Sequence, residues 1–343
     1  MNNLHVVAML IDDKSGEIVN AVDMSIADSD APVFALDKPN LTLLCDVTEK
    51  LNVIDSNVPS ADAEDYVFTS SNENVVKVLE DGFIRATGAG SAVVTCNSKN
   101  GSGTAQCKVT VRDWTNEVTV ETPGTLHNFV GLLDYKELKV NGQLDAMDMR
   151  YIRSLTGGRD DYSADQGGSV RCLNLKDATL VSDNRPVTKD GESWYGGQSF
   201  EYKDIIYPYI FLNSHINTFI CPKSLKGIDV DAFAVSSLRN VTLFEGIEQI
   251  GQGAFQELVL NSVYLPSTVS YYNLSLKYSQ IDYCWVDSHN PNYMTYNNDI
   301  YTKDSKKLVH YSNSGRYTLE LPDWCTEIAD YLVFQDFGTL YFK

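Results

Sequence analysis

Basic side chains are scarce in this sequence. Its 343 residues include 27 Lys and Arg against 46 Asp and Glu, which gives a formal net charge of -19 at pH 7. Neutralising the phosphates of a nucleic acid requires clustered Lys and Arg, and attraction to an anionic membrane surface requires the same residues. We therefore expect no nucleic-acid partner and no docking on anionic lipids.

Long apolar runs are also missing. No stretch reaches the ~18 apolar residues of a membrane-spanning helix, and the first residues lack the basic region and apolar run of a signal peptide. We therefore expect no membrane-spanning segment in this chain. Apolar runs at 5–11 and 17–22, separated by polar turn residues, predict a hairpin that is too small to fold alone. We interpret residues 1–26 as the remnant of an upstream domain.

Cysteine is sparse and scattered. The seven cysteines form no Cys-x-x-Cys pair and no Cys/His quartet with zinc spacing. Cys45 and Cys96 fall on inward-facing positions of predicted strands, so a disulfide between them is possible in an oxidising compartment. Two packed free thiols are the alternative that we favour. A thiol titration of the denatured chain distinguishes the two, because seven free thiols would exclude the bond.

Catalytic motifs are absent from the sequence. The five histidines form no His-Glu-x-x-His motif and lie at no triad-like spacing to a carboxylate, and no Gly-x-Ser-x-Gly elbow occurs. Residues 140–148 resemble the calcium loop of dockerins, but Lys139 and Gln143 replace the carboxylates that calcium needs. The Gly-rich loop with Asp160, Asp161 and Asp165 is a better calcium candidate. We predict no catalytic residue, no cofactor and no metal site, and therefore no enzyme.

The most informative feature that is present is a repeat with a period of 22 residues. Apolar residues recur at this offset in two successive units: Ile228 and Ile250, Ala232 and Ala254, Phe233 and Phe255, Leu238 and Leu260, Val241 and Val263. Such a period is typical of leucine-rich repeats, whose units bury their faces only by stacking on their neighbours. The period also explains Gly251-Gln252-Gly253, which is part of a repeat and not a phosphate loop, because no Lys-Ser/Thr follows it.

Two further segments have recognisable patterns. Residues 38–112 predict many short strands with regular turns, including the hairpin signal Asp81-Gly82, and this pattern is typical of a β-sandwich. Residues 124–175 predict a short helix near 124–133, a strand at 138–140, a helix from Asp145 to Leu155 and a strand at 170–175.

Two families share these motifs. The segment "YVFTSSNENVVKVLEDGFIRATGAGSAVVTCNSKNGSGTAQCKVTV" is similar to a bacterial immunoglobulin-like group 2 domain, with Phe68 where that family usually has Trp. The segments "SLRNVTLFEGIEQIGQGAF" and "LNSVYLPSTV" resemble BspA-like leucine-rich repeats. Asn290-Pro291-Asn292-Tyr293 and Ile300-Tyr301-Thr302-Lys303-Asp304 fit the β-hairpin unit that such arrays often insert. The combination resembles surface proteins of Gram-negative gut and oral anaerobes.

The resemblance implies a mainly β fold, in which an immunoglobulin-like β-sandwich precedes a leucine-rich repeat solenoid with a short α/β cap. The domains implied are the hairpin at 1–26, the sandwich at 27–114, the cap and start of the array at 115–205, and the repeats at 206–343 with a hairpin insert at 278–311. It further implies a monomeric, non-catalytic adhesion or binding protein, secreted or anchored as an outer-membrane lipoprotein. The sandwich would serve as a spacer.

The expected partner is a host or bacterial surface protein or glycan. Tyrosine suits recognition because a large ring carries a polar tip, and the insert region is rich in aromatic residues. The candidate binding residues are Tyr283, Trp285, Tyr293, Tyr296 and Tyr301. Two alternatives stay open: an accessory, non-catalytic tail of a carbohydrate-processing surface enzyme, and a purely structural spacer.

Overall fold

The computed structural model describes residues 5–11, 18–25, 34–55, 66–99, 103–158, 167–182, 203–272, 279–312, 318–329, 332 and 339–341. These ranges are mainly β and contain a single α-helix, and no helix among them is long and apolar enough to cross a membrane. At the N-terminus, β1 (His5–Ile11) pairs antiparallel with β2 (Ile18–Ser25), as the hairpin pattern predicts.

Residues 34–112 form small sheets around one core, with antiparallel pairing throughout except between β4 and β11, which pair in parallel. The larger sheet has the order β4-β11-β10-β7 and the smaller has the order β5-β9-β8, while β3 pairs with β6. In β11, alternate residues Ala105, Cys107, Val109 and Val111 point into the core. The strands are β3 (Phe34–Leu36), β4 (Asn40–Leu44), β5 (Thr48–Lys50), β6 (Val53–Asp55), β7 (Tyr66–Ser70), β8 (Val76–Val78), β9 (Phe83–Ala86), β10 (Gly90–Ser98) and β11 (Thr104–Arg112).

The predicted Asp81-Gly82 turn connects β8 to β9. Both residues have positive φ, 50° and 69°, which is the backbone that a tight hairpin turn requires. A Cβ on Gly82 would lie 2.6 Å from the carbonyl oxygen of Leu51, so the close approach of the two chain segments also requires glycine.

A small α/β segment follows, made of β12 (Glu117–Val120), the short 3-10 helix η2 (Leu126–Asn128), β13 (Glu137–Leu144) and α1 (Ala146–Leu155). The sequence places the start of this helix at Asp145, and Asp145 is its N-cap, with a side chain that accepts from the backbone N–H groups of Met147 and Asp148. In return, the carboxylate of Asp148 accepts from Asp145 N and also from Gly124 N and Leu126 N.

The two acidic residues of the 140–148 segment therefore satisfy backbone N–H groups, which accounts for their positions without calcium. Asp160, Asp161 and Asp165 lie outside the described residues.

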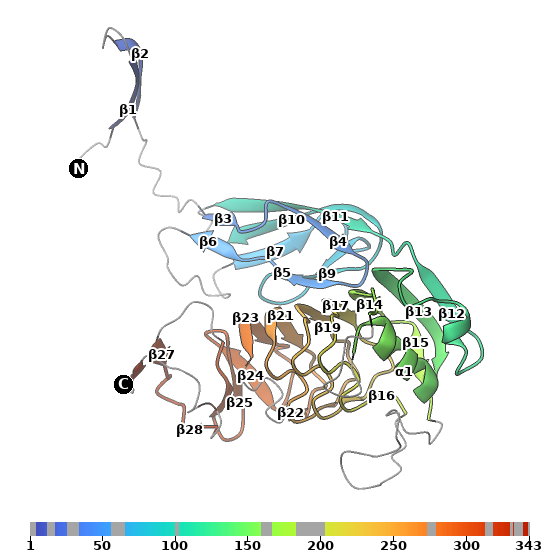
Figure 1. The fold of residues 1–343 in the computed structure, drawn as a ribbon. Coiled ribbons are helices and arrows are strands. Elements are labelled where there is room, and N and C mark those ends of the chain that lie inside the picture. The colour runs from blue at the N-terminus through green and yellow to red at the C-terminus, as the bar shows by residue number, and fades with distance from the viewer. Residues whose placement is uncertain are drawn as a thin grey trace.

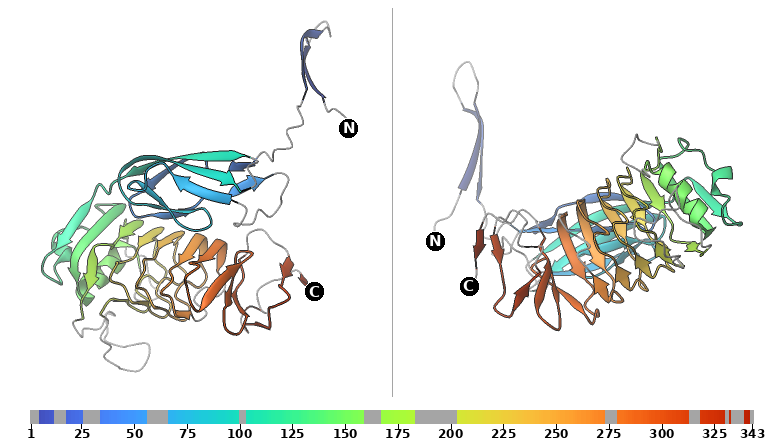
Figure 2. Two further views of the ribbon diagram at one scale, coloured as in Figure 1. Left: turned by 180° about the vertical axis from the view of Figure 1, so that it is seen from behind. Right: turned by 60° about the horizontal axis from the view of Figure 1, so that its bottom comes forward.

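The repeats stack as two parallel ladders (Figures 1 and 2). The larger sheet has the order β12-β13-β14-β17-β19-β21-β23, with β15 also paired to β13, and the second has the order β16-β18-β20-β22. Each strand pairs with its counterpart in the next unit, so the 22-residue period becomes the spacing of the ladder. The strands are β14 (Cys172–Asn174), β15 (Ala178–Leu180), β16 (Ile205–Ile206), β17 (Thr218–Ile220), β18 (Gly227–Ile228), β19 (Asn240–Thr242), β20 (Gln249–Ile250), β21 (Val259–Leu265), β22 (Tyr271–Tyr272) and β23 (Gln280–Val286).

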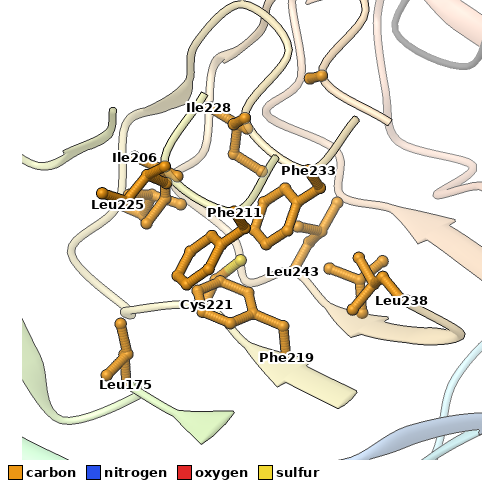
Figure 3. Packing of buried hydrophobic residues seen from close by; sticks show 14 of the residues in the cluster. Leu175, Ile206, Phe211, Phe219, Cys221, Leu225, Ile228, Phe233, Leu238 and Leu243 are labelled. Atoms are coloured by element: carbon orange, nitrogen blue, oxygen red, sulfur yellow. The ribbon is translucent and has the colours of Figure 1, made fainter. Parts of the chain in front are cut away.

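A column of phenylalanine rings forms the core of the array (Figure 3). Phe233 stacks on Phe211 and Phe255 at centroid distances of 4.9 and 5.4 Å, and Phe219 packs against Phe233 at 5.0 Å. Phe211 lies 22 residues before Phe233, so the repeat starts one unit earlier than the sequence matches indicate. That unit carries Ile210 where later units have alanine, which hid the pattern.

Among the described strands, the larger sheet ends at β23, which lies within the predicted bounds of the hairpin insert (278–311), and the rest of the insert forms a separate sheet. Its strands β24 (Tyr293–Tyr296), β25 (Asp299–Thr302) and β26 (Lys307–His310) pair with one another, and β26 pairs in parallel with β28 (Glu327–Ile328). Strand β27 (Thr318–Glu320) pairs with β29 (Thr339–Tyr341) in a separate sheet. No described strand pairs with the outer edge of β23. Side chains satisfy it instead, because Cys284 N donates to Asn298 Oδ1 and Val286 N donates to Thr295 Oγ1, both at 2.8 Å.

Candidate functional site

The five predicted binding residues occupy two different places. Tyr293 is 9% exposed and belongs to the core of the array, Tyr301 is fully buried in a smaller cluster with Leu308, and Tyr296 is 41% exposed. Tyr283 and Trp285 lie on β23, where residues 34–112 cover them: Lys50 Nζ lies 6.0 Å from the ring centroid of Tyr283, and Trp285 Nε1 donates to Glu80 Oε2 at 3.0 Å. The structure therefore offers Tyr296 to an external partner and keeps the other four in internal contacts.

Trp285 belongs to a row of residues on the outer face of the larger sheet. Parallel pairing places one residue from each of five successive strands in line. The inward neighbours in the same strands, such as Phe219 and Val263, form the core of the array, so this row points the other way. We call it the outward row; its members are Asn174, Ile220, Thr242, Tyr264 and Trp285.

Every member of the outward row contacts residues 34–112, which lie along the array in both views (Figures 1 and 2). Ile220 is fully buried in the hydrophobic core of residues 34–112. The ring of Tyr264 meets Phe83 edge to face at 5.4 Å, and Thr242 Oγ1 accepts from Thr48 N at 2.9 Å. This face of the larger sheet is therefore covered by residues 34–112 from β14 to β23.

Charged groups complete this contact at both ends and in the middle. At the β14 end, Asp46 is 5% exposed and forms an ion pair with Lys176 and a 3.1 Å hydrogen bond with Asn174 Nδ2. In the middle, Arg85 Nη2 donates to the carbonyl oxygen of Leu243 at 2.9 Å, and its guanidinium lies 4.8 Å from the ring centroid of Phe244. Burial lowers the pKa of Arg85, because desolvation disfavours the charged guanidinium.

At the β23 end, Glu80 accepts hydrogen bonds from Trp285 Nε1 and from both Ser288 N and Ser288 Oγ. Glu80, Asp287 and His289 are the only group within the described ranges whose side chains are spaced to share a metal ion. Burial opposes ionisation of Asp287, but hydrogen bonds from His289 and Tyr264 hold its pKa below the usual value. These hydrogen bonds account for the positions of both carboxylates without a metal.

The exposed Tyr296 has an aromatic neighbour that sequence reasoning did not select. Trp324 follows the insert in the chain and meets Tyr296 at a centroid distance of 5.4 Å and the buried Tyr301 at 4.8 Å. Lys306 Nζ lies 5.7 Å from the Trp324 ring centroid. The sequence signal that could have found Trp324 is its place in the repeat that resumes after the insert, which must pack on the insert from the other side.

The insert also buries a titratable group. His310 is 1% exposed, its Nε2 has no hydrogen-bond partner among the described residues, and burial lowers its pKa to about 3.

The unfolded chain must therefore bind a proton at His310 near pH 6.5 that the folded chain does not bind. We expect stability to fall by about 2 kcal/mol between pH 7 and pH 5 from this group alone, at about 1.4 kcal/mol per pH unit below pH 6.5. Urea unfolding of the wild type and of His310→Gln at both pH values measures the effect. An equal pH dependence in the two proteins would contradict it.

The seven cysteines are free thiols in the structure. Cys45 and Cys96 are both buried, and burial raises the pKa of each to about 12. Cys45 Sγ donates to Asp113 Oδ1 at 3.1 Å. The arrangement is that of the packed thiols favoured above, and the Cys45–Cys96 disulfide stays a prediction for an oxidising compartment.

Comparison with known protein families finds one match in the N-terminal half of the chain and another in the C-terminal half. Residues 31–109 match the bacterial Ig-like domain (group 2), and residues 202–288 match the BspA type leucine rich repeat region, in six copies. Domains of both kinds are typically non-catalytic and are typical of bacterial surface proteins. No curated protein sequence matches the chain.

Two solved structures are similar to parts of the chain. The crystal structure of the pneumococcal vaccine antigen PcpA is 15% identical, with a TM-score of 0.36, over 66% of this chain and 48% of that one. A leucine-rich repeat protein from Eubacterium ventriosum is 16% identical, with a TM-score of 0.30, over 47% of this chain and 44% of that one. The match therefore spans less than half the length of either structure. The two matched regions, together with the Ser-Ser-Asn and Ala-Phe motifs that they share with their families, show that this chain carries a bacterial Ig-like domain of group 2 followed by leucine-rich repeats of the BspA type.

Proposed function

We propose that the chain is a non-catalytic cell-surface module for adhesion or binding, and that it contacts its partner through the hairpin insert of the repeat array. In this proposal, the Ig-like domain is a β-sandwich at 27–114, the cap occupies 115–205, and the repeats at 206–343 form a solenoid. The hairpin at 1–26 is the remnant of an upstream domain. The full-length protein would be held at the cell surface, with an outer-membrane lipoprotein anchor as the form to look for.

The observation that supports the hairpin insert as the binding site is the contact between the rings of Tyr296 and Trp324. Tyr296 is 41% exposed and Trp324 is partly exposed, and the cation of Lys306 lies beside them. Tyrosine and tryptophan are among the residues that most often dominate the energy of binding interfaces. The outer face of the larger sheet contributes less to this proposal because the Ig-like domain covers it.

The partner class is a protein or a glycan. A screen of the intact chain against an array of glycans and extracellular-matrix proteins identifies it. Hits in neither class would favour a structural spacer. A catalytic domain in the full-length reading frame would favour an accessory tail of a carbohydrate-processing enzyme. Sedimentation of the chain tests the expected monomer.

The substitution Tyr296→Ala is expected to weaken binding to a hit at least tenfold, because truncating an aromatic hot-spot residue typically costs about 2 kcal/mol or more of binding free energy and tenfold corresponds to about 1.4 kcal/mol. Its effect on the free energy of unfolding should stay within about 1 kcal/mol, since Tyr296 is an exposed residue outside the buried core. Titration calorimetry or biolayer interferometry measures the affinity.

Phe129→Ala is the matched control, because Phe129 is also an exposed aromatic residue, at 56% exposure, but lies on the cap. Unchanged affinity of Tyr296→Ala for every hit would overturn the assignment of the insert.

A further inference from the structure

A row of basic and amide side chains lies along the strand starts of the larger sheet. Each member after the first donates from its backbone N to the carbonyl oxygen of the member before it, at distances between 2.6 and 2.9 Å. The first four directly precede the strands β13, β14, β17 and β19, and the fifth lies within β21. We call it the basic row; its members are Lys136, Arg171, Asn217, Arg239 and Asn261.

The basic row is open to solvent, unlike the outward row. Lys136, Arg239 and Asn261 are exposed, and Arg171 and Asn217 are partly exposed. The last three members lie 22 residues apart in the sequence, so they hold the same position in successive repeats. Neighbouring strands of a sheet lie about 4.8 Å apart, so the five backbone positions together span about 19 Å. The row is therefore an extended surface that crosses the strands.

The three cations of the basic row form no ion pair with a carboxylate of the described residues. Other cations of the array do form such pairs, as Lys139, Lys176 and Lys226 show. The carboxylate of Glu137, which is adjacent to the row, is bound by both terminal nitrogens of Arg112 at 2.7 and 2.8 Å. The row therefore carries three uncompensated positive charges on a chain whose formal net charge is -19.

Backbone carbonyl groups hold the two guanidinium groups of the row in place. Arg171 Nη1 donates to Gly168 O and Val170 O at 2.8 and 3.2 Å, and Arg239 Nη1 donates to Val259 O at 2.9 Å. A guanidinium has five N–H donors, so each arginine keeps donors for a ligand. A group that is already ordered loses less conformational entropy on binding, and its fork matches the two oxygens of a carboxylate.

The chemistry of the row selects a class of ligand. Guanidinium and ammonium groups bind carboxylates, while the amides of Asn217 and Asn261 can both donate to and accept from sugar hydroxyl groups. The excess negative charge of the chain repels a densely charged polymer such as a nucleic acid. The positive charge ends at the next strand, where the exposed Asp282 lies beside Asn261. A linear chain of uronic acid sugars fits, because each sugar carries one carboxylate and several hydroxyl groups.

We propose that the basic row binds a carboxylate-bearing polysaccharide that lies across the strands of the array. Arg171 and Arg239 bind carboxylates of the polymer through paired hydrogen bonds, and Lys136 forms an ion pair with a third. The amides of the row hydrogen-bond to the hydroxyl groups between these carboxylates. This surface is not the hairpin insert, so its assignment and that of Tyr296 can fail independently.

Binding of the intact chain to three uronic acid polymers tests the proposal. Polygalacturonate, alginate and hyaluronate are immobilised separately in calcium-free buffer, and biolayer interferometry measures the affinity for each. We expect binding to at least one of them that weakens as salt is added, because the charges are at the surface. The double variant Lys136→Gln with Arg239→Gln should bind that polymer at least tenfold more weakly, since it loses two charged hydrogen-bond donors.

The matched control is Lys223→Gln with Lys226→Gln. Both lysines are exposed on the same array but outside the row, and the change in net charge is the same. This control should keep the affinity of the unaltered chain, and the melting temperatures of both double variants should match that of the unaltered chain because all four side chains are exposed. Arg239→Lys keeps the charge but not the fork, so its affinity should fall between those of the unaltered chain and the test variant.

Three results would overturn the assignment. The first is the absence of binding to all three polymers, and the second is binding that the test variant retains in full. The third is a lack of selectivity: methyl-esterified polygalacturonate, which has the same sugars without the charge, or polyglutamate, heparin or DNA would bind as tightly as the uronic acid polymer. Tight binding of these other polyanions would identify the row as a general anion surface and not as a polysaccharide site.

Discussion

Replacing Phe233 by alanine is expected to lower the free energy of unfolding by about 3–5 kcal/mol, the usual cost of removing a buried aromatic ring. The ring is fully buried and contacts Phe211 and Phe255, which lie 22 residues before and after it. It also contacts Phe219 of β17. Its removal leaves a cavity that rigid neighbouring strands cannot fill. Urea or thermal unfolding measures the loss.

Two further variants provide comparisons for the loss of unfolding free energy in Phe233→Ala. Phe233→Leu keeps most of the volume and should cost less than the alanine variant. Val259→Ala changes a residue of the same array that is 42% exposed, and should cost about 1 kcal/mol or less. A loss for Phe233→Ala no larger than that for Val259→Ala would show that the phenylalanine column does not hold the array together.

The second large effect is expected at Asp148. Its carboxylate is 1% exposed and accepts from the backbone N–H groups of Gly124, Leu126 and Asp145 at 2.7, 2.9 and 3.1 Å. Asp148→Ala leaves these donors without their acceptor, at about 1–3 kcal/mol for each buried group that water cannot reach. We expect a total loss of about 3 kcal/mol or more, measured by urea unfolding.

Asp148→Asn keeps one acceptor oxygen and should lose about half as much. Millimolar calcium should change neither variant nor the wild type, because the carboxylate is already committed to backbone donors. A calcium-dependent rise in the melting temperature of the wild type that Asp148→Ala abolishes would restore the calcium interpretation of residues 140–148.

The sequence pattern predicted the core positions of the repeats and the helix α1, because both depend on residues that are close in the sequence. The 22-residue offset identified Phe233, Phe255, Ile228 and Ile250 as core positions, and all four are buried. The helix predicted from Asp145 to Leu155 is α1, because its apolar residues recur every three residues. Both family resemblances are confirmed by the matched regions.

The contact between the two domains could not be predicted in the same way. Periodicity indicates which strand residues point outward, but it does not indicate what covers them. The outward row contains Asn174, Ile220, Thr242, Tyr264 and Trp285, a mixture that fits an exposed face as well as a buried one. The groups that meet it come from residues 46–85, more than 120 positions away in the pairs that form hydrogen bonds.

Amino-acid composition also does not indicate which of the predicted binding residues are exposed. Tyr296 and Tyr301 lie five residues apart in the same hairpin, yet one is 41% exposed and the other fully buried. A strand exposes alternate residues, and only the position of Trp324 and the following repeat decides which face of the hairpin is covered. Aromatic content therefore does not distinguish the exposed tyrosine from the buried one.

The folded-back position of the Ig-like domain also decides how the chain would respond to mechanical load. A domain joined end to end with an array would make the molecule longer. Here the Ig-like domain lies beside the array and adds little to its length (Figure 1). Residue 34 and β23 lie toward the same end, so tension between them would peel the contacts one at a time, from Glu80–Trp285 toward Asp46–Lys176. We expect the chain to lengthen by about the length of one domain as these contacts break.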